Sequence, residues 1–160
     1  MNEKPTMIEL LKSPILLLAY GFGLGLVPKA PGTFGTLAGI PLVIIVMYLS
    51  PLWAVLLLSA LFLVGIPICQ SGSQRLGKED PGAVVWDEIV GYGIAVIAIP
   101  FSVWAVVAAF VLFRIFDILK PWPIRWADTK VHGGLGIMLA DVLAGLMALS
   151  VMHLLGFFIN

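Results

Sequence analysis

The sequence predicts an all-α protein: a polytopic membrane helix bundle with about five crossings and an N-terminal helix that is re-entrant or interfacial. The first observation behind this prediction is composition. Hydrophobic residues make up 61% of the 160 residues and charged residues 11%, against about 45–50% and about 25% in soluble domains. A soluble domain this small could not bury so much apolar surface. The other two observations are the lengths of the apolar runs and the positions of the basic loops. The chain is expected to form a single domain spanning residues 1–160.

Six apolar runs are separated by short polar segments. A helix needs roughly 20 residues to cross about 30 Å of hydrocarbon, with a range of about 17–25. The longer runs meet this length, whereas the shorter ones need residues from their flanks. The first run has no signal-peptide cleavage site and leads into a loop rich in proline and glycine. The runs cover approximately residues 14–27, 36–49, 52–69, 84–99, 103–119 and 136–159.

The basic residues occupy alternate loops. Lysines flank the first run on both sides, and further lysines and arginines lie in the loops 71–83 and 120–135. The turns near 50–51 and 100–102 carry none. The positive-inside rule places the basic loops in the cytoplasm, provided that the first run does not cross and five crossings follow. Six crossings would place Lys29 outside and invert every later loop, so we rank that topology second.

Charge balance and cysteine content exclude several classes of protein. Nine acidic and nine basic residues give no net charge, which excludes a basic arm for nucleic acid. The single cysteine, Cys69, excludes internal disulfides and a multi-cysteine zinc site. Cys69 and Arg75 match the Cys-x-x-Gly-x-x-Arg pattern of cysteine phosphatases, which need a thiolate at a helix N-terminus. Cys69 instead ends an apolar run, so a buried apolar cysteine is preferred and a cysteine-dependent lipid phosphatase is an alternative.

Four carboxylates are predicted to reach one depth, just inside the cytoplasmic face. Asp87 and Glu88 open the third crossing, Asp117 closes the fourth, and Asp141 lies about one turn inside the fifth. Acids in apolar runs are costly and usually have partners or functions. Hard oxygen ligands favour Mg²⁺, or Mn²⁺, as a shared cation. The alternative is separate ion pairs, such as Arg114 with Asp117 one turn away. Acids in the polar flanks are expected to be solvated; they are Glu3, Glu9, Glu79 and Asp80.

Carboxylate-bound metal beside basic residues indicates phosphate chemistry, because a metal polarises a phosphoryl group and activates water. The loop 28–36 leads into a helix whose N-terminus attracts anions, and Thr33 or Thr36 is suited to cap it. His132 lies in the basic loop, where it serves either as a proton donor to the leaving group or as an ordinary interfacial histidine. The basic side chains on the inner side are Lys29, Arg114, Lys120, Arg125 and Lys130.

Three segments carry a specific combination of motifs. They are Gly21-Phe22-Gly23-Leu24-Gly25 through Pro31-Gly32-Thr33, then Val85-Trp86-Asp87-Glu88, and then Phe113-Arg114-Ile115-Phe116-Asp117 through Lys120-Pro121-Trp122-Pro123-Ile124-Arg125 and His132-Gly133-Gly134-Leu135-Gly136-Ile137-Met138 to Asp141. In this order, over nearly the whole chain, they resemble the phosphatidylglycerophosphatase A family of bacterial inner-membrane enzymes. The resemblance implies Mg²⁺-dependent removal of the terminal phosphate from phosphatidylglycerophosphate, giving phosphatidylglycerol. It also implies a multi-pass protein of the bacterial inner membrane, and the positive-inside rule places the expected active site at the cytoplasmic face.

The residue predictions follow from these patterns and this resemblance. Phosphatidylglycerophosphate and bilayer lipid are the expected partners, and no protein or nucleic-acid partner is inferred. The predicted catalytic residues are Asp87, Glu88, Asp117, Asp141 and His132. The predicted metal ligands are Asp87, Glu88, Asp117 and Asp141. The predicted substrate-binding residues are Lys29, Thr33, Arg114, Lys120 and Arg125.

The chain departs from the family pattern at one position. In that pattern two adjacent aspartates follow the Gly-Ile-Met segment, whereas here Ala140 stands first and only Asp141 remains. Either the missing carboxylate is dispensable, or the chain is an inactivated variant that binds lipid while the chemical step suffers. One turn after Asp141, Gly145 is expected to leave room for a ligand or headgroup.

A small membrane transporter or channel is an alternative from another class. Broken helices and intramembrane acids also mark ion pathways. A pathway needs polar residues along its whole length, however, whereas the acids here are predicted to cluster at one face. The sequence also shows no inverted repeat, so the lipid phosphatase is the preferred prediction.

Overall fold

The computed structural model describes the backbone of residues 4–159 and the side chains of residues 4–156. Every regular element in that part of the chain is helical, which confirms the all-α prediction. The elements are α1 (Met7–Lys12), α2 (Pro14–Ala19), η1 (Gly21–Leu26), α3 (Pro31–Ala38), α4 (Ile40–Tyr48), α5 (Pro51–Leu76), α6 (Trp86–Ile94), α7 (Val103–Leu119), α8 (Ile124–Lys130) and α9 (Gly133–Ile159).

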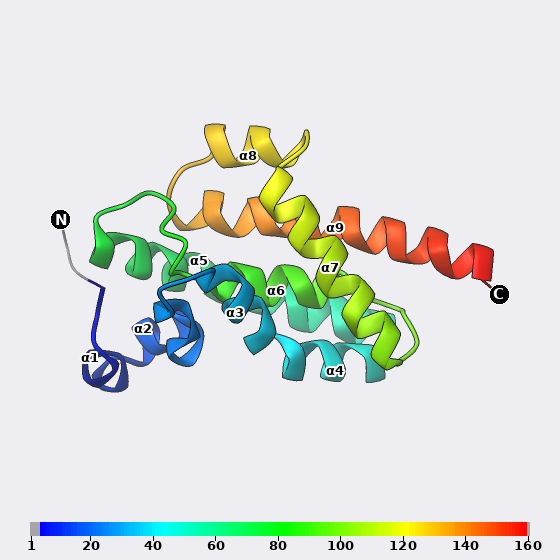
Figure 1. The fold of residues 1–160 in the computed structure, drawn as a ribbon, viewed down its shortest axis with the longest axis horizontal. Helices are drawn as coiled ribbons and strands as arrows, with labels where there is room; N and C mark the ends of the chain where they lie inside the picture. Colours follow the sequence, from blue (N-terminus) through cyan, green and yellow to red (C-terminus); the bar gives the residue numbers. More distant parts are fainter. Residues whose placement is uncertain (1–3, 160) are drawn as a thin grey trace.

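Five segments run along the long axis of the molecule in alternating directions (Figure 1). α3 with α4, α6 and α9 lead away from the end where α1 lies, and α5 and α7 return towards it. Residues 4–30, 77–85 and 120–132 therefore gather towards one end, which we call the loop end. All lysines and arginines of the described chain lie in these segments, in the last turn of α5 or in the last two turns of α7.

Three segments of the described chain are long and apolar enough to cross a membrane: Pro31–Tyr48, Pro51–Leu76 and Gly133–Gly156. The nine residues of α6 span only about 14 Å, and α7 has 17 residues. The predicted five crossings are therefore not confirmed. The first apolar run forms the short helices α2 and η1 rather than one long helix.

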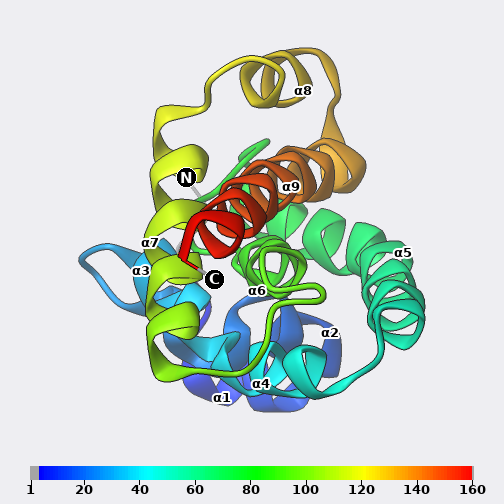
Figure 2. The same ribbon diagram turned by 90° about the vertical axis from the view of Figure 1, so that its right-hand side faces the viewer.

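α6 is the central helix of the bundle (Figure 2). All nine of its residues are buried, and it packs against α3, α4, α5, α7 and α9. Gly91 permits this close approach, because a methyl group there would stand 2.6 Å from the ring of Phe113 and 2.7 Å from the carbonyl oxygen of Asp141. Asp87 and Glu88 occupy the first turn, where the helix dipole favours negative charge. The packing thus places two acids inside the protein.

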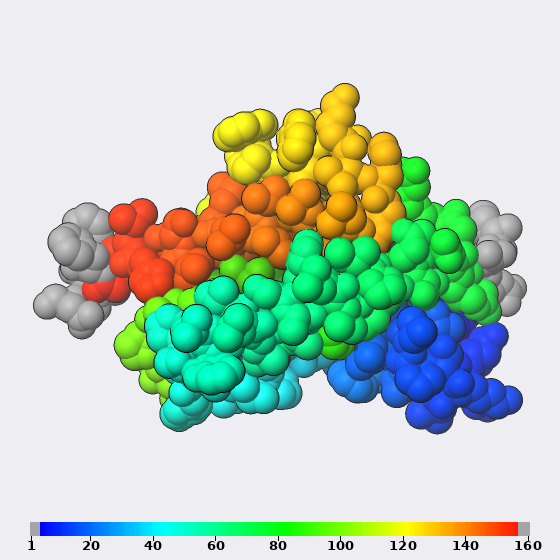
Figure 3. Space-filling view, turned by 180° about the vertical axis from the view of Figure 1, so that it is seen from behind, coloured from blue at the N-terminus to red at the C-terminus, as the bar shows by residue number. Residues whose placement is uncertain are grey.

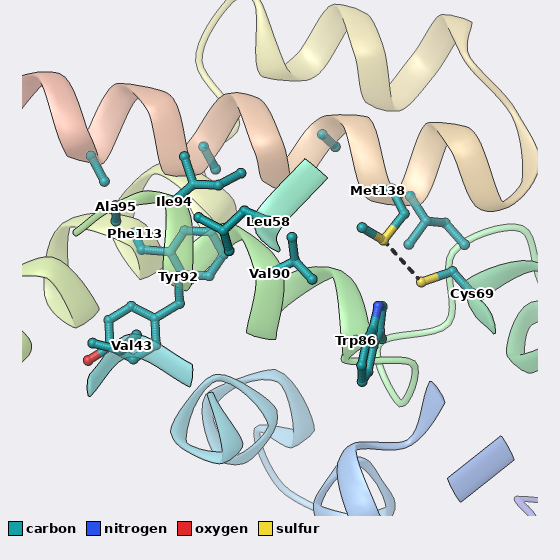
Figure 4. Packing of buried hydrophobic residues seen from close by; sticks show 14 of the residues in the cluster. Val43, Leu58, Cys69, Trp86, Val90, Tyr92, Ile94, Ala95, Phe113 and Met138 are labelled. Atoms are coloured by element: carbon teal, nitrogen blue, oxygen red, sulfur yellow. Dashed lines mark hydrogen bonds between the residues drawn. The ribbon is translucent and has the colours of Figure 1, made fainter. Parts of the chain in front are cut away.

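The apolar core joins α5, α6, α7 and α9 (Figure 4). The rings of Tyr92 and Phe113 stack with centroids 6.3 Å apart. Cys69 of α5 faces Met138 of α9 at a sulfur–sulfur distance of 3.5 Å. The predicted space at Gly145 is absent, because a methyl group there would overlap the carbonyl oxygen of Gly91. That expectation was wrong, and the glycine instead lets α9 pack closely on α6.

The N-terminal helices form a lobe on the side of the molecule opposite α8 (Figure 3). The Tyr20 hydroxyl donates to the Gly72 carbonyl oxygen at 3.0 Å, and the Val85 amide donates to the Ala19 carbonyl oxygen at 2.8 Å. Glu9 pairs with Arg75 at 3.0 Å. Hydrogen bonds from Thr6, together with this arginine, hold the pKa of Glu9 below its ordinary value. The lobe is therefore fixed to the end of α5 and to the loop 77–85.

Candidate active site

A cluster of charged side chains joins α6 and α7 towards the loop end. Nη1 of Arg114 donates to Oε1 of Glu88 at 3.0 Å and also to Oδ2 of Asp117. The predicted pair of Arg114 with Asp117 is confirmed, and Glu88 is a second partner. The three side chains are only 15%, 10% and 13% exposed. Ion pairs shielded from water in this way are stronger electrostatically than exposed pairs.

The start of α3 completes the surroundings of Glu88. The Thr36 hydroxyl lies 3.2 Å from Oε2 of Glu88 and donates to the Gly32 carbonyl oxygen at 2.8 Å. A methyl group at Gly32 would overlap Oε1 of Glu88 and stand 3.0 Å from Nη2 of Arg114. The helix therefore approaches the ion pair through a residue without a side chain. Thr33 lies half-buried in the same first turn, and Lys29 is exposed on the loop before it.

Two buried carboxylates keep an oxygen without a hydrogen-bond partner among the described residues. These atoms are Oδ1 of Asp87 and Oδ2 of Asp141. The carboxyl group of Asp117 lies near that of Asp141, and Asp87 and Asp141 both feel the negative charge of Glu88 and Asp117. Leaving such oxygens buried and unpaired is costly. A cation would offset that cost.

The metal site itself remains a prediction. Across the described side chains, no three histidines, cysteines or acids already surround one point as the ligands of an ion. Arg114 bridges Glu88 and Asp117 instead. The arrangement therefore combines the two interpretations of the sequence, because it contains ion pairs and also two buried acids that each keep one unpaired oxygen among the described residues.

Lys120 connects this cluster to a second group of acids. It ends α7 in a left-handed conformation with φ of 44°, and its Nζ lies 2.5 Å from Oδ1 of Asp128 and 3.5 Å from Oδ2 of Asp80. Partial burial alone would lower the pKa of Lys120. The hydrogen bond to Asp128 and the charges of Asp80 and Asp128 outweigh burial and raise it. Asp80 was expected to be solvated, and no sequence pattern indicated this contact across the loop.

Two predicted residues lie apart from the cluster. The side chain of His132 is 68% exposed, lies 3.8 Å from Glu79, and lines a small cavity of about 130 Å³ beside Asp80 and Asp128. Arg125 is exposed on α8. Of the predicted catalytic and substrate-binding side chains, the carboxylates, Arg114 and Lys120 are brought together.

The cysteine pattern lies within one continuous helix. Cys69 is buried in α5, and Arg75 on the same helix pairs with Glu9. A cysteine phosphatase needs backbone amides that are open to phosphate at a helix N-terminus, whereas amides within a helix are already bonded. This placement argues against the alternative of a cysteine-dependent phosphatase.

The fold and the site define a class: a small helical protein whose described residues include three helical segments long and apolar enough to cross a membrane, with a charged, mostly acidic centre towards one end of its bundle. Residues 17–156 match the family model of phosphatidylglycerophosphatase A. The chain is 42% identical to phosphatidylglycerophosphatase A of Escherichia coli (strain K12) over 147 residues, which is 91% of this chain and 86% of the relative. The same-named protein of Haemophilus influenzae is 49% identical over 152 residues, 94% and 93% of the two chains.

A further relative is 41% identical over 137 residues, 81% of this chain and 86% of its own length. It comes from Bacteroides thetaiotaomicron and carries the provisional name phosphatidylinositol-3-phosphatase. No solved structure matches the chain. The chain belongs to the phosphatidylglycerophosphatase A family and is a phosphatase, as the motif resemblance predicted.

Proposed function

We propose that the chain hydrolyses the terminal phosphate of phosphatidylglycerophosphate and yields phosphatidylglycerol, with Mg²⁺ or Mn²⁺ as its cofactor. The observation that carries the proposal is the pair of unpartnered, buried oxygens on Asp87 and Asp141, beside the pair formed by Arg114 and Asp117. The substrate follows from the names of the two phosphatidylglycerophosphatase A relatives.

The donor set fits a hard divalent cation. Carboxylate oxygens are ligands that Mg²⁺ accepts readily, and Asp87, Asp117 and Asp141 would hold the ion with Glu88 beside them. When bound, such an ion polarises the phosphoryl group and lowers the pKa of a coordinated water. Asp87 and Asp141 can each offer an oxygen to it without giving up a hydrogen bond.

The basic residues bind the phosphorylated headgroup. Arg114 suits this role, because its planar guanidinium can bond two oxygens at once and its buried Nε has no partner among the described atoms. Lys120 stays protonated beside the cluster, since its pKa is raised. Lys29 and Thr33 lie where the N-terminus of α3 attracts anions. Arg125 and His132 contact the headgroup from the loop 120–132, with His132 as proton donor to the leaving group.

The lipid remains in the bilayer of a bacterial inner membrane while its headgroup enters from the cytoplasm. In this proposal the five alternating segments are crossings, and the positive-inside rule places the loop end in the cytoplasm. The N-terminal lobe lies at the interface, because Ile8, Leu11 and Ile15 expose apolar surface beside Lys12. Ala140, buried next to Asp141, makes this chain a slowed variant.

Phosphate release from the purified protein in mixed micelles tests the proposal. We expect Mg²⁺-dependent release from phosphatidylglycerophosphate and little release from phosphatidylinositol 3-phosphate, the substrate that the name of the third relative indicates. Release from the inositol lipid alone would replace the proposed substrate. Phosphate release that continues undiminished after divalent cations are chelated would reject Mg²⁺ or Mn²⁺ as the cofactor.

A further inference from the structure

We propose that Glu88 is a positioning residue for Arg114 and not a metal ligand, and that Thr36 and Gly32 complete its support. The assignment rests on the proposed function, since it concerns how the headgroup phosphate and the cation are shared among the acids. It divides the acidic cluster into a phosphate subsite around Arg114 and a cation subsite around Asp87 and Asp141.

The hydrogen bonds of the acids differ. Oε1 of Glu88 accepts from Arg114 at 3.0 Å, and Oε2 lies 3.2 Å from the Thr36 hydroxyl. Asp87 and Asp141 each have a buried oxygen with no partner among the described residues. To bind an ion, Glu88 would have to release a charge-assisted hydrogen bond, which is about twice as strong as a neutral one. Asp87 and Asp141 would release nothing.

The shape of α3 fits the ion pair. Gly32 and Thr36 lie one turn apart and are both buried. The Thr36 hydroxyl is held by the Gly32 carbonyl oxygen at 2.8 Å. Any side chain at position 32 would overlap Glu88 and crowd both terminal nitrogens of Arg114. The start of α3 therefore fixes where Glu88 holds the guanidinium.

Asp117 connects the two subsites. It accepts from the same Nη1 of Arg114 as Glu88 does, and its carboxyl group lies near that of Asp141. Arg114 keeps its Nε as a further donor, buried and without a partner in the described chain. Removing the charge of Glu88 should therefore weaken the phosphate subsite and leave the cation subsite intact.

The test measures two quantities separately for each variant: Mn²⁺ affinity by calorimetric titration without lipid, and KM and kcat for phosphatidylglycerophosphate. Glu88→Gln should raise KM about tenfold, because a hydrogen bond loses its charge assistance, while Mn²⁺ affinity stays within about twofold. Asp87→Asn should abolish Mn²⁺ binding. Glu9→Gln is the matched control, because it neutralises an arginine-paired glutamate outside the cluster, and it should change neither quantity.

Two further variants keep the proposal testable if Glu88→Gln does not fold. Thr36→Val should raise KM in the same direction by a smaller factor. Arg114→Lys should raise KM. The double variant with Glu88→Gln should raise KM by less than the product of the two single fold-changes, because the two residues act as one unit.

A loss of Mn²⁺ affinity in Glu88→Gln equal to that in Asp87→Asn would overturn the assignment, and so would an unchanged KM. If the wild-type protein bound no Mn²⁺ and released no phosphate, the proposed function would fail and the division into subsites would fail with it. The wild-type measurement therefore separates the two failures.

Discussion

At the loop end, charged side chains are buried in contact with one another, whereas at the far end, around residues 49–50 and 99–102, the contacts are aromatic or made by the backbone. At the loop end, Arg114 has two carboxylate partners. At the far end Tyr48 stacks on Phe101 with centroids 5.3 Å apart, and Nε2 of His153 lies 3.1 Å from the Ile97 carbonyl oxygen. The same helices serve both ends, so the chemistry depends on local side chains on a shared scaffold.

α9 allows the two ends to be compared on one helix. Asp141→Asn removes a charge from the cluster, and we expect turnover to fall at least about 100-fold, within the range of a lost acid–base group. Ser150→Ala, further along α9, removes only a hydroxyl that donates to the Leu146 carbonyl oxygen at 2.8 Å, and turnover should be unchanged. Phosphate release from both purified variants checks the contrast. Equal losses would mean that the far end takes part in the reaction.

The packing of α9 should differ along its length in the same way. Gly145→Ala places a methyl group against the Gly91 carbonyl oxygen and 3.0 Å from Cβ of Ile94. We expect this overpacking to destabilise the protein by about 1–3 kcal/mol. No described atom lies within 4 Å of a methyl group at Gly156. Gly156→Ala should therefore be neutral or stabilise by up to about 1 kcal/mol. Thermal unfolding in detergent measures both, and a reversed order would contradict the close packing of α6 on α9.

Position 140 sharpens the comparison within the loop end. Ala140→Asp restores the carboxylate of the family pattern, and we expect turnover to rise at least about tenfold, the scale of a weak acid–base contribution. Affinity for the lipid should change much less, because the proposed headgroup contacts come from the basic residues. Turnover and a lipid-binding titration on both forms distinguish the roles. Equal turnover would show that position 140 is not catalytic, and a large change in affinity would assign it to binding.

Local spacing predicted part of the site correctly. Arg114 and Asp117 are three residues apart on one helix, and this spacing alone determines that they meet. The contact between Arg114 and Glu88 spans 26 residues and two helices. It depends on the rotation of α6, and periodicity gives no rotation for a helix that is buried on every side. The contact of Lys120 with Asp80 was equally hidden, because a loop fixes no register.

The fold was predictable to a similar extent. Composition and run length predicted the all-helical fold and the long apolar helices, and charge placement indicated the loop end. The run 84–99 was expected to cross, yet its helix covers only Trp86–Ile94. A residue in left-handed conformation, Ala98, and then Pro100 follow it. Hydropathy does not distinguish a segment buried in protein from one buried in lipid, and this is why the length of α6 was overestimated.

If the long helices cross a bilayer, as we propose, the enclosure of α6 has a consequence for how the protein responds to lipid. A helix that faces lipid tilts or bends when the bilayer thickness does not match its length. In the proposed membrane placement, α5 and α9 would undergo this adjustment, since their outer faces carry exposed residues such as Leu63 and Leu154. α6 meets only protein, so its nine residues need not match any bilayer. In that placement, Asp87 and Glu88 would be insulated from changes in lipid composition that the surrounding helices accommodate.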